Sequence, residues 1–116
     1  MSKFLSIGDF STVSHLTVKA LRFYHEKGVL VPARVEAGTG YRFYTPQQVE
    51  RATVIRRLRD LEFSIREIQE LLSESTDDHD IVNQLQSKHD NVRERIAVER
   101  RVQRMLAQII QQVKEH

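Results

Sequence analysis

The last third of the chain constrains the fold most, because from about Asp80 to Glu115 it contains neither glycine nor proline. Apolar residues recur there at spacings of three, four and seven, an imperfect heptad pattern whose gaps hold Lys88, Arg95 and Glu99. The spacing predicts one helix of about 35 residues, roughly 50 Å long. The apolar positions of this seam are Ile81, Leu85, Val92, Ile96, Val102, Leu106, Ile109 and Val113.

A helix of that length is too long for the small preceding region to cover. Its seam therefore needs another helix, and pairing with a second copy of the chain is the simplest arrangement. A helix folded back on its own domain is the alternative. We expect two domains, residues 1–75 and a dimerisation helix over residues 76–116.

The charge of the chain is uneven although its net value is only +2. Residues 1–62 contain 10 Lys/Arg and 6 Asp/Glu, whereas residues 63–116 contain 8 and 10. A basic first part and a slightly acidic second part place any contact with a polyanion in the first part.

Several classes of protein are disfavoured by the composition. There is no cysteine, so disulfides and thiolate metal or redox sites are excluded. No apolar run approaches a membrane span and no secretory signal pattern occurs, so we expect a cytoplasmic protein without membrane contact. The five histidines are scattered, and no nucleophile–base pair or phosphate-cradling glycine loop is present. We expect no enzymatic activity, no metal and no cofactor.

Two short helices are predicted near the N-terminus. The first should start after Ser6, which has capping-box spacing to Asp9, and stop near residues 14–16. The second should run for about three turns from the N-cap Thr17 to Gly28, which suits the left-handed position after a helix. Two short helices about three residues apart are a helix-turn-helix candidate.

The second of these helices has two unlike faces. Ala20, Leu21 and Tyr24 share one face, and the opposite side carries Lys19, Arg22, Phe23 and Glu26. Cations beside an exposed ring can serve phosphates, base edges and sugars, which favours a nucleic-acid contact. An ordinary amphipathic helix is the alternative.

Residues 34–36 and 41–44 favour strands, and the turn between them contains Gly38 and Gly40. They predict a β-hairpin directly after the helix-turn-helix, which is the position of a wing. A small sheet that only closes the core is the alternative.

Three further helix starts follow. Thr45 is predicted to cap a helix with Pro46 at its first position and Gln48 at its third. Ser64 and Glu67 have capping-box spacing before a short apolar helix, and the acidic segment around Asp80 should cap the long helix. The arginines of the helix after Thr45 could be solvated or touch phosphates; they are Arg51, Arg56, Arg57 and Arg59.

The order of these elements, with the strings KALRFY over residues 19–24 and GYRFYT over residues 40–45, strongly resembles the MerR family of transcriptional regulators. The multidrug-sensing branch is the most similar, and the resemblance covers essentially the whole chain. It implies a mainly α fold: a winged helix-turn-helix with a short β-hairpin wing, then a long helix that forms an antiparallel coiled coil in a homodimer.

The resemblance also implies a function. Such dimers bind pseudo-palindromic promoter DNA and distort it between the −35 and −10 elements, which affects RNA polymerase indirectly. Carried over position by position, the DNA contacts would be Thr17, Lys19, Arg22, Phe23, Tyr24, Tyr41, Arg42 and Arg59. Phe23 departs from the commoner Tyr, and His25 replaces a frequent Asp.

The chain also departs from the family at its end. The metal sensors of the family use cysteine there, and this chain has none. The pattern stops at His116 without a helix stop signal, so we expect a longer natural protein in which a following domain binds an unidentified effector. A naturally short member of the family without its own small-molecule pocket is the alternative. The main competing hypothesis is a coiled-coil adaptor with only non-specific affinity for DNA.

Overall fold

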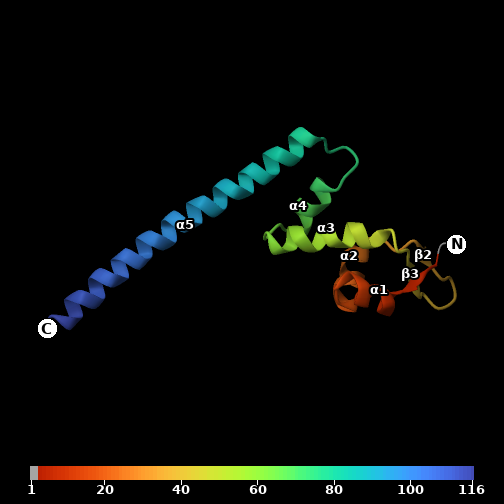
Figure 1. Ribbon diagram of the computed structural model, residues 1–116, viewed down its shortest axis with the longest axis horizontal. Helices are drawn as coiled ribbons and strands as arrows, with labels where there is room; N and C mark the ends of the chain where they lie inside the picture. Colours follow the sequence, from red (N-terminus) through yellow and green to blue (C-terminus); the bar gives the residue numbers. More distant parts are fainter. Residues whose placement is uncertain (1–2) are drawn as a thin grey trace. The chain divides into compact units, whose positions relative to one another are not determined.

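The computed structural model describes residues 3–116, which divide after Thr76 into two compact units. The first two residues of the expected first domain lie outside the described part. The first unit holds seven elements and the second is a single helix, α5 (Figure 1). In chain order the elements are β1 (Leu5–Ser6), α1 (Ile7–Ser14), α2 (Val18–Glu26), β2 (Arg34–Val35), β3 (Arg42–Tyr44), α3 (Gln48–Asp60), α4 (Ile65–Leu71) and α5 (Asp78–Lys114).

Helices α1 and α2 form the predicted helix-turn-helix. The Ser6 hydroxyl accepts from the Asp9 N–H at 3.1 Å, and the Thr17 hydroxyl accepts from the Ala20 N–H at 3.0 Å. These bonds satisfy N–H groups that the helix itself leaves without a partner. Between the helices, His15 adopts a left-handed conformation with φ of 61°. Both predicted caps are confirmed.

The predicted hairpin is also confirmed, and it belongs to a larger sheet. Strands β2 and β3 are antiparallel, with Arg34 opposite Phe43, and Gly40 takes a φ of +74° in the connecting turn. Strand β1 adds to the other edge of β3, with Leu5 opposite Tyr44, so the strand order is β1-β3-β2. The sheet thereby ties the start of the helix-turn-helix to the wing.

The start of α3 differs from the prediction. Thr45 does not cap the helix; α3 begins at Gln48, after a turn in which the Gln48 N–H donates to the Thr45 carbonyl at 3.0 Å. The Gln48 side chain accepts from the Thr45 N–H at 3.0 Å and donates to the Val31 carbonyl at 2.6 Å. Gln48 therefore makes one of the two hydrogen bonds of a capping box. The turn is held by the bond from Gln48 to Val31 and not by a bond to the Thr45 hydroxyl.

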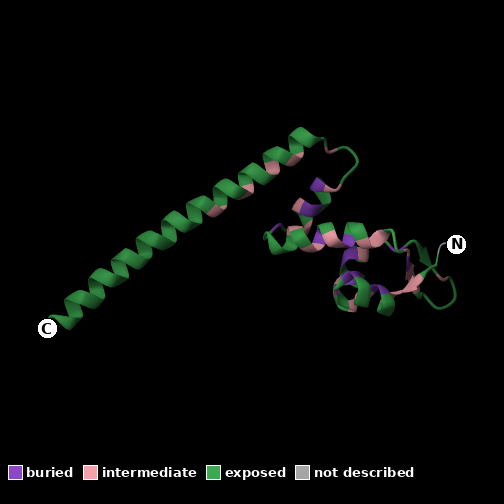
Figure 2. Ribbon diagram, viewed as in Figure 1, coloured by how far each residue is buried: buried purple, intermediate pink, exposed green. Residues whose placement is uncertain are grey.

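One apolar core holds the first unit together (Figure 2). Phe10 of α1 stacks on Tyr44 of β3, with ring centroids 4.4 Å apart and planes inclined by 10°. Leu21 of α2 and Ile55 of α3 are fully buried. Burial of such side chains stabilises a fold by about 1.5–3 kcal/mol each. The core fixes the positions of α2 and of the hairpin.

Helices α4 and α5 both begin at capping boxes. Ser64 and Glu67 form one, as predicted, and Asp77 and Asp80 form the other. Helix α5 extends over 37 residues, starting slightly before the predicted position, and none of its residues is buried (Figure 2). Within residues 3–116, no helix combines the length and apolar character that crossing a membrane requires.

Candidate nucleic-acid interface

The two faces of α2 are divided as the sequence predicts. Leu21 and Tyr24 are buried, whereas Lys19, Arg22 and Phe23 are exposed. Phe23 is a large apolar ring with 41% of its surface exposed, and the Lys27 ammonium lies 5.6 Å from its centroid. A ring beside cations on a free helix face can contact sugars and phosphates of a nucleic acid.

Tyr24 differs from the other expected contacts. Only 7% of its surface is exposed, because it belongs to the same face as the buried Leu21. Its backbone carbonyl also accepts from the Val29 N–H at 2.9 Å, at the point where the chain leaves α2. The main role of Tyr24 in the structure is therefore to pack α2 onto the core.

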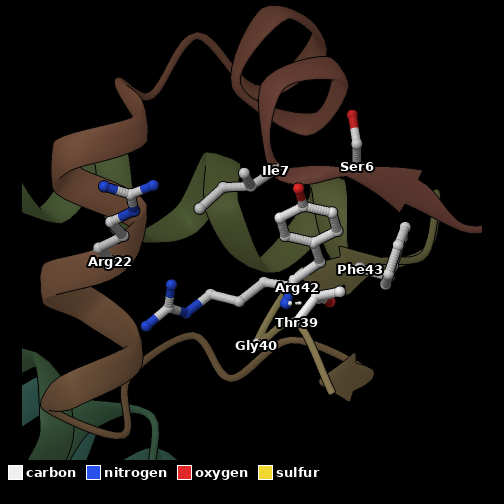
Figure 3. A pocket seen from close by; sticks show the side chains of 8 residues that line it. Ser6, Ile7, Arg22, Thr39, Gly40, Arg42 and Phe43 are labelled. Carbon is white, nitrogen blue, oxygen red and sulfur yellow. Dashed lines mark hydrogen bonds between the residues drawn. The ribbon is translucent and has the colours of Figure 1, made fainter. Parts of the chain in front are cut away.

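A cleft of about 460 Å³ separates α2 from the hairpin (Figure 3). Arg42 extends from β3 toward α2, and Arg22 projects from α2 into the same cleft. The start of α1 and the hairpin turn complete its walls; the lining residues are Ser6, Ile7, Arg22, Thr39, Gly40, Tyr41, Arg42 and Phe43. Two guanidinium groups beside one cleft make it cationic and suited to phosphate oxygens.

The hairpin presents its expected contact residues differently. Tyr41 is 65% exposed at the end of the turn, where its N–H donates to the Thr39 hydroxyl at 3.1 Å. Arg42 is half-buried, and its Nε donates to His25 Nδ1 at 2.8 Å. A cross-element bond of this kind holds the hairpin against the last turn of α2.

Tyr44, at the foot of the hairpin, is fully buried. Within the described part of the chain, its hydroxyl has no hydrogen-bond partner. Burial raises the pKa of this phenol, and the positive charge of Arg42 partly offsets the rise. The hydroxyl therefore stays neutral and contributes little to the positive potential of the cleft.

Three arginines of α3 have structural roles that the sequence left open. Arg51 Nε donates to the Val29 carbonyl at 2.8 Å, and Arg56 Nη1 donates to the Ser14 carbonyl at 3.1 Å. Arg59, an expected phosphate contact, donates through Nη1 to the Phe63 carbonyl at 3.0 Å. A guanidinium has five N–H donors, so each group retains donors for a further contact. No local pattern could reveal the bonds of Arg51 and Arg56, because their acceptors are distant in the sequence.

The predicted seam of α5 is solvent-accessible along its length. Ile81 and Val92 are half-buried, and the other six seam residues are exposed. Val102 is 45% exposed and Val113 is 68% exposed. Among residues 3–116, no three His, Cys, Asp or Glu side chains are grouped so that they could hold a metal ion.

Two adjacent short helices, a basic exposed face on the second and a hairpin beside it define a winged helix-turn-helix domain. Comparison with known families agrees. Residues 5–75 match the protein family described as "MerR HTH family regulatory protein". Residues 49–113 match the family described as "MerR, DNA binding". The chain belongs to the MerR family of regulatory proteins.

Individual relatives are similar over different lengths. HTH-type transcriptional regulator CueR from Escherichia coli O157:H7 is 38% identical over 69 residues, which is 60% of this chain and 50% of CueR. Transcriptional regulator BrlR from Pseudomonas aeruginosa is 33% identical over 107 residues, 90% of this chain and 38% of BrlR. The chain thus spans half of CueR and less of BrlR.

A solved structure of an EcmrR–DNA complex, part of the assembly EcmrR-RPo, has the same fold. The TM-score is 0.73 at 33% identity, over 88% of this chain and 38% of that one. The relatives compared are transcriptional regulators, and this neighbour is bound to DNA.

Proposed function

We propose that this chain is the DNA-binding and dimerisation part of a cytoplasmic transcriptional regulator that binds double-stranded promoter DNA. The observation that carries the proposal is the cationic cleft between α2 and the hairpin, with Arg22 on one wall and Arg42 on the other. The likeness to the EcmrR–DNA complex supports it.

In this proposal α2 enters a major groove. Thr17 and Lys19 stand at its N-terminal end, and Arg22 has the planar fork that can bind a guanine edge or a phosphate bidentately. Phe23 supplies ring contact without the hydroxyl of a tyrosine. Tyr24 supports the helix from the core.

The hairpin would hold the DNA backbone beside that groove. Tyr41 and Arg42 lie at the cleft and can reach phosphates and sugars, which position a protein without selecting a sequence. Arg59 would add a phosphate contact from the end of α3.

We propose that α5 pairs with α5 of a second copy, so that residues 1–75 bind DNA and residues 76–116 dimerise. With Ile96 set aside, the other seam residues and the charged gaps at Lys88, Arg95 and Glu99 follow alternating spacings of four and three from Ile81 to Val113. The same positions read identically in both directions about residue 97. An antiparallel pair centred there places each of these positions opposite another of them.

The charges favour the antiparallel direction. With the two-fold axis near residue 97, Arg95 of one chain faces Glu99 of the other, and this happens twice. In a parallel pair Arg95 would face Arg95 and Glu99 would face Glu99, which is destabilising in a coiled-coil interior.

Cysteine cross-linking can test this direction, because the natural sequence has no cysteine. In an antiparallel pair Val92 of one chain lies opposite Val102 of the other, whereas the two copies of Val92 are about 15 Å apart. A mixture of the Val92→Cys and Val102→Cys chains should form mixed disulfides. Each variant alone should form few, and efficient self-linking of both would overturn the antiparallel arrangement.

The dimer would act on transcription by distorting the DNA between the −35 and −10 elements, so that RNA polymerase responds indirectly. An effector of unknown identity would act through a domain beyond residue 116. The family membership supports this regulatory role, and we assign the chain no catalytic step.

Selection from a pool of random duplexes tests the proposed function. The purified chain should enrich an inverted repeat and bind it well above its affinity for unselected DNA at moderate salt. Equal binding to selected and unselected duplexes, by a folded dimeric chain, would overturn it in favour of the adaptor hypothesis.

A further inference from the structure

His25 and Arg42 join the two elements that form the cleft. His25 lies in the last turn of α2, and Arg42 lies on β3, seventeen residues later. Arg42 Nε donates to His25 Nδ1 at 2.8 Å, and both residues are half-buried. A guanidinium can only donate, so Nδ1 is the acceptor and the proton of a neutral His25 is on Nε2.

The bond leaves the two terminal nitrogens of the Arg42 guanidinium available. It uses the single Nε–H, and the two terminal nitrogens keep four N–H donors for a bidentate contact with a phosphate. An arginine side chain has several rotatable bonds, and fixing it in advance removes an ordering cost from DNA binding. Arg22, one turn before His25 on α2, lines the same cleft.

We propose that His25 is a positioning residue for DNA binding: it holds Arg42 so that α2 and the wing offer a phosphate one preformed cationic surface. The inference rests on the proposed function, because it assigns Arg42 a phosphate contact. His25 itself needs no contact with DNA.

Three substitutions separate this role from general packing. His25→Asn keeps an acceptor at the same place, since the Asn Oδ1 is bonded to Cγ as Nδ1 is. His25→Gln moves the acceptor one bond outward, and His25→Ala removes it. Only His25→Asn should preserve the bond to Arg42.

Affinity for the selected duplex is measured by fluorescence anisotropy. His25→Ala and His25→Gln should weaken binding about five-fold, the equivalent of one net hydrogen bond, and His25→Asn should stay within about two-fold. In an Arg42→Ala background, His25→Ala should have almost no further effect, because the histidine acts through the arginine. An equal loss in both backgrounds would overturn the positioning role.

Nuclear magnetic resonance of the DNA-free chain reports the pair directly. The Arg42 Nε–H should exchange slowly with solvent in the natural chain and in His25→Asn, and rapidly in His25→Ala. Rapid exchange in the natural chain would overturn the pair itself. If the pair is observed but no duplex is selected, the proposed function fails instead, and the positioning role fails with it.

Discussion

The two units of this chain use apolar residues in opposite ways. In the first unit, Phe10, Leu21, Tyr44 and Ile55 bury one another around a common core. In the second, a helix of 37 residues carries an imperfect apolar seam whose residues are exposed or only half-buried. The first unit therefore has a core of its own, whereas the seam of the second is left uncovered, as the proposed pairing with a second copy requires.

The difference has a thermodynamic consequence. A unit with its own core unfolds with a free energy that does not depend on protein concentration. A helix stabilised by a second chain gains stability as the concentration rises.

Val102→Lys should break the dimer, because it places two unpaired ammonium groups in the proposed seam, at a cost of several kcal/mol. Ala97→Lys is the matched control, since residue 97 lies on the opposite side of α5. Sedimentation at micromolar concentration should find the first variant monomeric and the second dimeric. A dimeric Val102→Lys chain would refute this placement of the seam.

Phe10→Ala should destabilise the first unit by about 3–5 kcal/mol, because it removes a buried ring and its stacking on Tyr44. Urea unfolding should show a loss that is independent of protein concentration. Val13→Ala, at an exposed position of the same helix, should change the stability by less than about 0.5 kcal/mol. Similar losses in both variants would contradict the assigned core.

Arg22→Ala should weaken binding to the selected duplex by about 1–3 kcal/mol and relax the sequence preference, if Arg22 reads a base edge. Titrations against selected and unselected duplexes measure both effects. An equal loss of affinity for the two DNAs would mean that Arg22 contacts a phosphate and does not read a base edge.

Arg59→Ala should weaken binding to all duplexes alike and lower the salt dependence of the affinity by about one unit of slope. The loss of affinity is expected to be the same for all duplexes, because Arg59 lies at the end of α3 and not on α2, where bases would be read. Binding across a range of salt concentrations measures the slope, and an unchanged slope would remove Arg59 from the interface.

Tyr44→Phe should leave the first unit as stable as before or up to about 1 kcal/mol more stable, because it removes a buried hydroxyl. Burial raises the pKa of Tyr44 above its ordinary value of 10.0, so folding favours the neutral phenol. The part of the folding stability that depends on a neutral Tyr44 is fully present below pH 10. It is lost as the pH rises through the higher pKa of the folded state. Urea unfolding should therefore show a steeper loss above pH 10 in the natural chain than in the variant.

Local patterns in the sequence predicted much of the fold. The side chains of Ser6, Thr17, Ser64 and Asp77 each cap a helix by bonding an N–H three residues later. Such short-range bonds depend on residue type and spacing, which a sequence displays. The two faces of α2 and the hairpin were predictable for the same reason, from periods of about 3.6 and 2 residues.

The bonds that depend on tertiary structure were not predictable. Thr45 is a residue type that is typical of an N-cap. The start of α3 is nevertheless fixed by Gln48, whose side chain donates to the distant Val31 carbonyl. The bond between His25 and Arg42 likewise exists only because the fold brings α2 and β3 together. The proposed contact surface could therefore be named by residue, but its internal bonds could not.

Hydroxyl-radical footprinting of the selected duplex tests at once whether the first unit binds DNA and whether the second unit pairs two copies. We expect two protected tracts related by two-fold symmetry, about one helical turn or a multiple of it apart. The Val102→Lys chain should protect neither tract at the same concentration. A single tract, or equal protection by the natural chain and by Val102→Lys, would contradict DNA binding by a dimer paired through α5.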